Sequence, residues 1–595
     1  MIALLAGILL HVALGTALAG VVWSVGLGWR IGGVYAYPIG LLTVTVGALL
    51  VLLTGWLALL VLPLVFWLLV RARSAIGDAL RRVRGPLAWA LPGAVALPVA
   101  LGLHLHGPTS ELDSNAYGDM VFYAAKLVSA TESVVPFRDL LVEGEASAYV
   151  EAGSSFLGGA LARLPGLDPF LFQTTAMPAF LLASIPIGLG LLGGRDDDVS
   201  RSHVPGPDPR AWLPVTGLLA VTMVAYPTWL TESPPVALAL PLTFAVYGLA
   251  CDRLPLGRFA VVAAVCAVDF ALTKGFGVIP LTVLVVFAFA RDHLPGLDRR
   301  RLLAVGGAVA ALGAAGLAFF LGTSGWLTEI FSLKFLPADA VRGLADQLDA
   351  RDTQAAGPAF ELAGSLALAL ALLRARATPF LTTFAVALLG HWLVGGHGFD
   401  ILVGMSILLS ALLFRRRPEL LRAQGALILA AAALLTISAW FRDISAVRAG
   451  FVFVALLAVA LVGAFAERRV LYAYAAVAAA VLVGLSGRSL VAFCLLVALF
   501  AVAALQPRAR WLAAGLALAG GLAVAAVSDL RLTTYDPTLT TDHYAVWQRA
   551  EEVVPPDGLV FTSLTGPVIS GDQGWNYYPG ITGRQIYLAG WSTSP

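Results

Sequence analysis

Acidic residues gather in one polar segment in the first third of the chain. Residues 104–151 hold eight carboxylates and only two basic side chains, Lys126 and Arg138. A carboxylate can accept the proton of a sugar hydroxyl while the anomeric carbon becomes oxocarbenium-like, which is the chemistry of inverting glycosyl transfer. Asp119 is our candidate for that base. The candidates for a second acid, among which the sequence does not choose, are Asp113, Asp139, Glu143 and Glu145.

Asp119 directly precedes a predicted short helix, MVFYAAKLVSA (120–130). Spacings of four and seven residues place Asp119, Tyr123 and Lys126 on one helix face. Asp119 also follows Gly118, so its side chain could cap the helix by accepting backbone N–H groups. One carboxylate can serve both roles, and both interpretations stand. In this segment we assign Asp113 and Asp119 to catalysis. We assign Tyr123, Lys126, Asp139 and Glu143 to substrate binding.

Lysine occurs at only three positions, 126, 274 and 334. In VDFALTKGFG (268–277), Asp269 falls inside an apolar run and Lys274 at its predicted outer end. Lys274 could neutralise a lipid phosphate as a point charge, or could simply extend to the membrane interface. Asp269 could be functional or pair with an arginine. Lys334 lies in a predicted outer loop that could guide a lipid tail or form an ordinary lid.

Histidine and arginine supply further candidates for binding phosphate or sugar. GHWLVGGHGFD (390–400) places His391 and His397 at a predicted membrane edge, as hydrogen-bond donors or as parts of a plain turn. This spacing is not that of a zinc site, and we assign no metal ligand. Arg442 could bind phosphate bidentately or pair with Asp443.

These residues must be positioned by a membrane domain. The chain is 59% hydrophobic and 12% charged, with a mean hydropathy of +0.86, whereas soluble domains carry about 25% charged residues. The formal net charge of +2 favours neither nucleic acid nor another acidic partner. Residues 1–23 lack a basic n-region and a cleavage site, which favours a first spanning helix over a cleaved signal.

Apolar runs recur along the chain and predict roughly 15–18 spanning helices. The run 38–70 could be one long tilted helix or two. The predicted spans are 1–23, 38–70, 87–103, 169–193, 211–231, 234–251, 258–275, 276–291, 302–322, 359–374, 378–395, 400–414, 424–441, 450–466, 470–486, 489–506 and 511–528.

The arginine-rich loops alternate with loops poor in arginine, which is the pattern of the positive-inside rule. If 71–84 is cytoplasmic, alternation places the basic segments 291–301, 374–376 and 415–424 inside as well. It then places three longer polar segments outside the cytoplasm. These segments are 104–168, 323–358 and 529–595. No GxxxxGK[ST] motif is present, and the one GxGxxG match, at 188–193, falls within the predicted spanning run 169–193, so neither pattern indicates a nucleotide site.

The C-terminal residues differ in character from the apolar runs before them. AVWQRAEEV (545–553) has helical spacing, while GLVFTS (558–563) and TGRQIYLAGW (582–591) have strand-like patterns. We therefore predict a transmembrane domain over 1–528 and a small extracytoplasmic α/β segment over 529–595. The aromatics in WNYYPG and YLAGW could stack on sugar rings or pack the segment against the rest of the chain.

The segment 118–169 resembles the first periplasmic loop of the GT-C superfamily, integral-membrane glycosyltransferases that use polyprenyl-phosphate sugars. Asp119 matches the aspartate of that loop, and Phe122 and Tyr123 match the aromatic or histidine positions that follow it. Many bacterial relatives have a histidine at the position that Tyr123 occupies in this chain. Val135-Pro136-Phe137 matches the break in that loop, and 151–164 matches its small-residue helix. The ending YYPGITGRQIYLAGW is similar to endings of bacterial relatives.

The resemblance implies a polytopic all-α membrane protein of GT-C type in the bacterial plasma membrane, with its site and C-terminus extracytoplasmic. It implies an enzyme that moves a sugar from a polyprenyl-phosphate donor to a glycan, glycolipid or protein acceptor of the envelope, with Asp119 as base. Some members hold a divalent cation beside this acid, so Mg²⁺, Mn²⁺ or Ca²⁺ is a possible cofactor. The alternatives are a transporter or flippase of a lipid-linked saccharide and a non-catalytic membrane scaffold.

Overall fold

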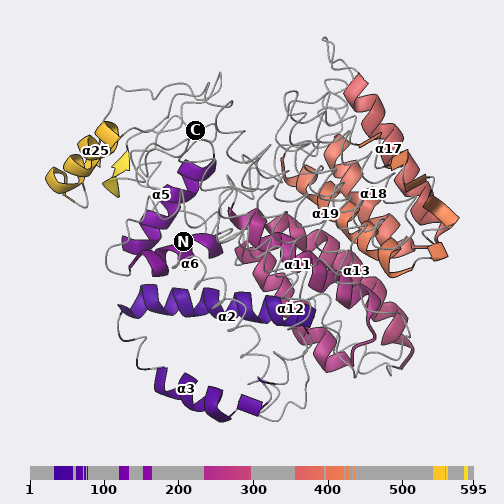
Figure 1. The fold of residues 1–595 in the computed structure, drawn as a ribbon, viewed down its shortest axis with the longest axis horizontal. Coiled ribbons are helices and arrows are strands. Elements are labelled where there is room, and N and C mark those ends of the chain that lie inside the picture. Colours follow the sequence, from indigo (N-terminus) through magenta and orange to yellow (C-terminus); the bar gives the residue numbers. More distant parts are fainter. Residues whose placement is uncertain are drawn as a thin grey trace, which may run out of the picture. The chain divides into compact units, whose positions relative to one another are not determined.

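A computed structural model describes part of the chain, and in that part the backbone is mainly helical (Figure 1). The described chain divides into two compact units. Unit 1 is 1–194, 223–241 and 515–595, and unit 2 is 195–222 and 242–514. The described residues are 33–55, 62–71, 119–132, 152–163, 234–296, 356–393, 397–417, 541–555, 558–560 and 582–586, with isolated residues and short runs between 57 and 77 and between 419 and 435.

Unit 1 contains the helices of the N-terminal half. The run 38–70 forms two helices, α2 (Gly33–Thr54) and α3 (Leu62–Arg71). Gly55 follows α2 with a φ of 60°, a left-handed conformation that glycine adopts without steric cost and that ends the helix. The predicted loop helices are α5 (Asp119–Glu132) and α6 (Gly153–Ala162). α6 packs against both α2 and α5.

The C-terminal segment of unit 1 has the elements that its sequence pattern predicts. They are α25 (Thr541–Val553), β1 (Leu559–Val560) and β2 (Gln585–Ile586). The two short strands pair in parallel, with Leu559 opposite Gln585 and Val560 opposite Ile586. A parallel pair needs a long connection between its strands, and the residues between 560 and 585 supply it.

Unit 2 is built from helices that match the predicted apolar runs. α11 (Pro234–Cys251) crosses the boundary between the units and is followed by α12 (Leu256–Leu272), the 3₁₀ turn η5 (Gly275–Gly277) and α13 (Val278–Asp292). A second 3₁₀ turn, η6 (Leu294–Gly296), follows α13. The remaining helices are α17 (Ala356–Arg374), α18 (Thr378–Leu393) and α19 (His397–Arg416).

Side-chain contacts set the direction of the helices in unit 2. Phe259 at the start of α12 contacts His293 after α13, with ring centroids 5.1 Å apart, so α12 and α13 run antiparallel. The Tyr247 hydroxyl donates to the Leu412 carbonyl at 3.0 Å, which brings the C-terminal parts of α11 and α19 together. η5 contacts α19, and α18 packs along α19. The end of α18 and the start of α19 therefore both lie at the η5 end.

The described arginines of unit 2 lie at one end of these helices. Arg376, in the turn between α17 and α18, lies at the end of the group away from η5, and so do the arginines at the ends of α13 and α19. The predicted inside segments 291–301, 374–376 and 415–424 thus share one end where they are described. The residues at the opposite end are Asp269, Lys274, Glu361, His391 and His397.

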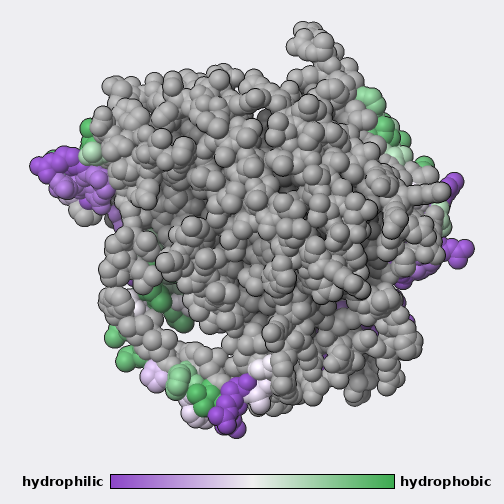
Figure 2. Space-filling view, in the orientation of Figure 1, coloured by the Kyte–Doolittle hydropathy of each residue, from purple (hydrophilic) through white to green (hydrophobic). Residues whose placement is uncertain are grey.

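By length and composition, two described helical stretches could cross a bilayer, Tyr37–Thr54 and Gly275–Asp292. A core helix of a soluble protein passes the same test, so two such stretches are weak support for a polytopic fold. A second feature is the outward face of α17, where four leucines at helical spacing are exposed. Figure 2 shows hydrophobic residues at the edge where Figure 1 draws α17. These leucines are Leu362, Leu366, Leu370 and Leu373.

Candidate functional site

α5 begins at the backbone of Asp119, one residue before the predicted helix 120–130. Tyr123, one turn later, is only 3% exposed, so its ring is part of the core of unit 1. Lys126 is half-buried on the same helix. The side chain of Asp119 lies outside the described residues, and both of its predicted roles, base and cap, stay predictions.

Small side chains allow α6 to lie close to α5. A Cβ added at Gly159 would be 3.3 Å from the Ala130 Cβ and 3.5 Å from the Leu127 carbonyl oxygen. The other end of α6 is equally enclosed, since Ser154 and Ser155 are each 1% exposed. The small-residue helix predicted at 151–164 therefore serves as the surface on which the C-terminal half of α5 rests.

Arg163, the residue after α6, ties three helices together. Its Nη1 donates to the Val51 carbonyl of α2 at 3.1 Å, and its Nη2 donates to the Thr131 carbonyl of α5 at 2.8 Å. The last carbonyls of a helix lack partners within it, so a guanidinium is a suitable cap for the end of α5. A hydrogen bond to a charged group contributes about 2 kcal/mol when it is buried, and less here because Arg163 is only half-buried.

Arg584, just before β2, makes a second set of bonds to helix ends. Its Nε donates to the Val554 carbonyl at 2.8 Å and its Nη2 to the Glu551 carbonyl at 3.0 Å, which caps the end of α25. Its Nη1 lies 3.5 Å from Oε1 of Glu132, the last residue of α5. One buried guanidinium thus connects the C-terminal segment to the helix that begins with Asp119.

Lys274 lies in the break between α12 and α13, where the sequence places it at a helix end. The break is tight, because a Cβ added at Gly277 would overlap the ring of Phe270. Asp269 is 1% exposed in the last turn of α12. Within the described part of the chain, neither of its carboxylate oxygens has a hydrogen-bond partner, and an arginine partner for Asp269 is likewise absent from those residues.

His391 belongs to a buried polar pair that the sequence did not predict. Its Nε2 lies 2.8 Å from Oε1 of Glu361, which joins the end of α18 to the start of α17. Trp392 packs edge-on against the imidazole, with centroids 6.0 Å apart. Both members of the pair are nearly enclosed, at 7% and 8% exposure. His391 is therefore held by a carboxylate and an aromatic ring rather than presented openly at a turn.

The predicted site residues fall in both units. Tyr123, Lys126 and the backbone of Asp119 belong to unit 1, and Lys274, His391 and the backbone of His397 share one end of unit 2. Among the described residues, no group of three or more His, Cys, Asp or Glu side chains could hold a metal ion. The predicted site residues that lie outside the described residues are Asp113, Asp139, Glu143, Lys334 and Arg442.

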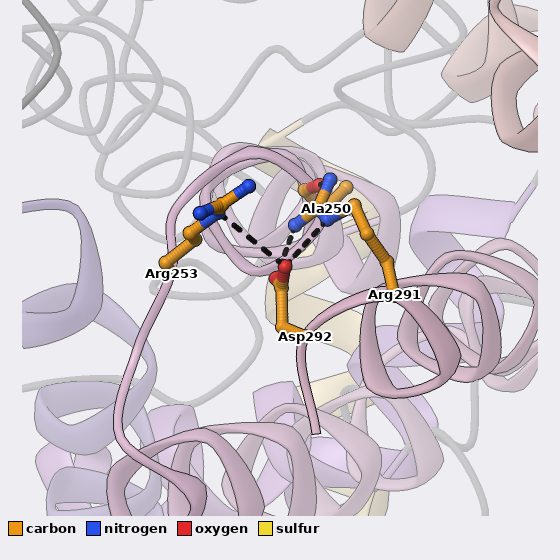
Figure 3. Close-up of polar contacts among 4 residues, drawn as sticks. All are labelled: Ala250, Arg253, Arg291 and Asp292. Atoms are coloured by element: carbon orange, nitrogen blue, oxygen red, sulfur yellow. Dashed lines mark hydrogen bonds and ion pairs between the residues drawn. The ribbon is translucent and has the colours of Figure 1, made fainter. Parts of the chain in front are cut away.

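The opposite end of unit 2 is organised by arginine (Figure 3). Arg291 donates from Nη1 to the Ala250 carbonyl at 2.9 Å, so it caps α11 from a neighbouring helix. It also binds both carboxylate oxygens of Asp292, and Arg253 lies 3.6 Å from Oδ1 of the same residue. These contacts satisfy helix ends, and we assign this cluster a structural role.

Three residues that sequence reasoning missed are Arg163, Glu361 and Arg584. Each has partners far along the chain, so no local spacing could reveal them. Isolated charges inside apolar or glycine-rich stretches, as in LARLP, AFELAG and TGRQ, were the available signal. Comparison with protein-family models, with curated proteins and with solved structures finds no match to this chain.

Proposed function

We propose that this chain is a polytopic membrane glycosyltransferase of GT-C type, which transfers a sugar from a polyprenyl-phosphate donor to an envelope acceptor. The observation that carries the proposal is the construction of unit 1. There, the helix that begins with Asp119 is fastened by Arg163 to the core helices and by Arg584 to the C-terminal segment. A transferase needs its base on an element held rigidly by the scaffold.

The proposed reaction is a single displacement at the anomeric carbon. The acceptor hydroxyl gives its proton to the Asp119 carboxylate as its oxygen bonds to C1, and the bond from C1 to the polyprenyl phosphate breaks. The phosphate leaves with the electron pair of that bond and needs cationic or hydrogen-bonding partners. In this proposal the cationic partner within unit 1 is Lys126, which is half-buried on α5.

Membrane insertion is supported by two features of unit 2. The leucines along the outward face of α17 present a continuous apolar strip, with Leu366 54% exposed, which suits lipid better than water. The arginines of the helix ends gather at one end, as the positive-inside rule requires for a cytoplasmic face. The opposite end, with Lys274 and the two histidines, would then face outward from a bacterial plasma membrane.

A transporter of lipid-linked saccharides is the second candidate, and buried Asp269 is the observation that favours it. Transporters place ionisable residues near the bilayer midplane. Asp269 lies three residues before the end of α12, which corresponds to about 5 Å along the helix axis. That position is close to the end of α12 rather than to its centre, which weakens the case for the transporter.

The test uses the full chain purified into liposomes and supplied with polyprenyl-phosphate arabinose, galactose or mannose and an envelope glycan acceptor. We expect transfer by the wild type and a loss of about 10²-fold or more in kcat for Asp119→Asn. Glu552→Gln, which removes an exposed carboxylate of α25, is the matched control and should be unchanged. Transbilayer movement of the donor without transfer would instead favour the transporter.

A further inference from the structure

The short segment Thr582-Gly583-Arg584 lies against the end of α5, within unit 1. Gly583 has a φ of 62°, and a Cβ added there would lie 2.5 Å from Oε1 of Glu132 and 3.4 Å from a methyl group of Val128. A side chain at this position would be both strained and obstructed. The backbone therefore approaches α5 as closely as a glycine allows.

The two partners of the contact are unequally exposed. The Arg584 side chain is 9% exposed and the Glu132 side chain 31% exposed, so the ion pair is partly shielded from water. Arg584 is already fixed by its bonds to the carbonyls of Glu551 and Val554. Because those two bonds orient the guanidinium, little side-chain entropy is left to lose when Nη1 meets Glu132.

We propose that Arg584 is a positioning residue, which clamps the C-terminal segment onto α5 and thereby sets the placement of Asp119. The catalytic consequence of this clamp rests on the transferase function proposed above. The clamp itself is a property of the fold. Glu132 is 13 residues after Asp119, or about 20 Å along the helix. Arg584 therefore acts on the site through the helix and does not touch the substrate.

The two arginines that hold the end of α5 differ in what they connect. Arg163 bonds α5 to its neighbours in the N-terminal half, while Arg584 connects α5 to a segment more than 450 residues away in the chain. Removing the second connection should leave the core of unit 1 folded. It should loosen only the end of α5 and, through it, the position of the base.

The experiment compares Glu132→Gln with Arg584→Ala in the purified full chain, by hydrogen exchange of the peptide 119–132 and of α25. Glu132→Gln removes the pair but keeps the cap of α25, so we expect about fivefold faster exchange in α5 alone. Arg584→Ala should accelerate exchange in both helices. Exposed Glu552→Gln is the matched control. Unchanged exchange of α5 in both variants would overturn the clamp, whether or not the protein transfers sugar.

The catalytic consequence has its own readout. If the wild type is active, we expect Glu132→Gln to lower kcat about fivefold with an unchanged KM for the polyprenyl-phosphate donor, and Glu132→Asp to restore part of the loss. An unchanged kcat beside faster exchange would overturn the positioning role. An inactive wild type would instead contradict the proposed transferase and the catalytic role, with the clamp decided by exchange alone.

Discussion

The C-terminal end of α5 in unit 1 and the η5 end of unit 2 are held in different ways. In unit 1, Arg163 and Arg584 reach from loops to main-chain carbonyls at helix ends. In unit 2, the helices of the η5 end interlock through apolar side chains and one buried pair, His391 and Glu361. Polar bonds at helix ends can be exchanged for bonds to water at modest cost, whereas interlocked cores cannot. We infer that the η5 end of unit 2 resists local opening more strongly than the C-terminal end of α5 does.

The largest effect on this contrast should come from breaking the buried pair of unit 2. Glu361→Ala leaves the imidazole of His391 buried without its carboxylate, and we expect a loss of about 4 kcal/mol in unfolding free energy. Thermal unfolding in detergent measures it. The double variant Glu361→Leu/His391→Leu is the control and should recover most of the loss. A single variant as stable as the wild type would contradict the rigid role of this end.

A charge on the outward face of α17 tests whether unit 2 contacts lipid. Leu366→Asp should cost about 3 kcal/mol for insertion into a bilayer and reduce the amount of chain recovered from membranes. Leu366→Ala is the matched variant and should be tolerated. Normal recovery of Leu366→Asp would indicate that this face contacts water and would weaken the membrane proposal.

The turn between α12 and α13 probes close packing directly. Gly277→Ala forces a methyl group against the ring of Phe270, and we expect a loss of about 2 kcal/mol. Gly275→Ala offers the comparison, because a Cβ at Gly275 would meet nothing within 4 Å. Equal melting temperatures for the two variants would show that this turn is not packed as tightly as its geometry indicates.

The smallest effect should come from unit 1. Arg163→Ala removes the bonds to Val51 and Thr131, and we expect the free energy of unfolding to fall by about 1.5 kcal/mol. The loss is small because water can reach the half-buried site and replace part of these bonds. Arg163→Lys should recover less than half, because an ammonium cannot span two carbonyls as a guanidinium does. Urea titration of both variants measures the two losses in unfolding free energy. A loss larger than that of Glu361→Ala would reverse the contrast between the units.

The helices of unit 2 could be predicted because their apolar runs are bounded by clear signals. α11 begins at Pro234 and has the predicted bounds, and α12 follows Pro255 and ends before Lys274 and Gly275. The helix of the acidic loop and the elements of the C-terminal segment could be predicted from spacing in the same way. Sequence alone left 38–70 open as one helix or two, and the left-handed Gly55 separates them.

The contacts that position the candidate site could not be predicted. Arg584 meets Glu132 and the carbonyls of α25 only because the chain folds back on itself, and main-chain carbonyls leave no trace in a sequence pattern. The carboxylate on which the proposed chemistry depends, Asp119, could be chosen from spacing and resemblance. Its preference over Asp113 rests on the same two grounds.

The central claim is that Asp119 is the base of a lipid-linked sugar transferase. The most direct measurement compares sugar transfer from a polyprenyl-phosphate donor by the wild type, Asp119→Asn and Asp113→Asn, each reconstituted in liposomes. We predict that Asp119→Asn loses about 10²-fold or more in kcat while binding of the donor is retained. Transfer by Asp119→Asn at the rate of an active wild type, with α5 still formed, would contradict the claim.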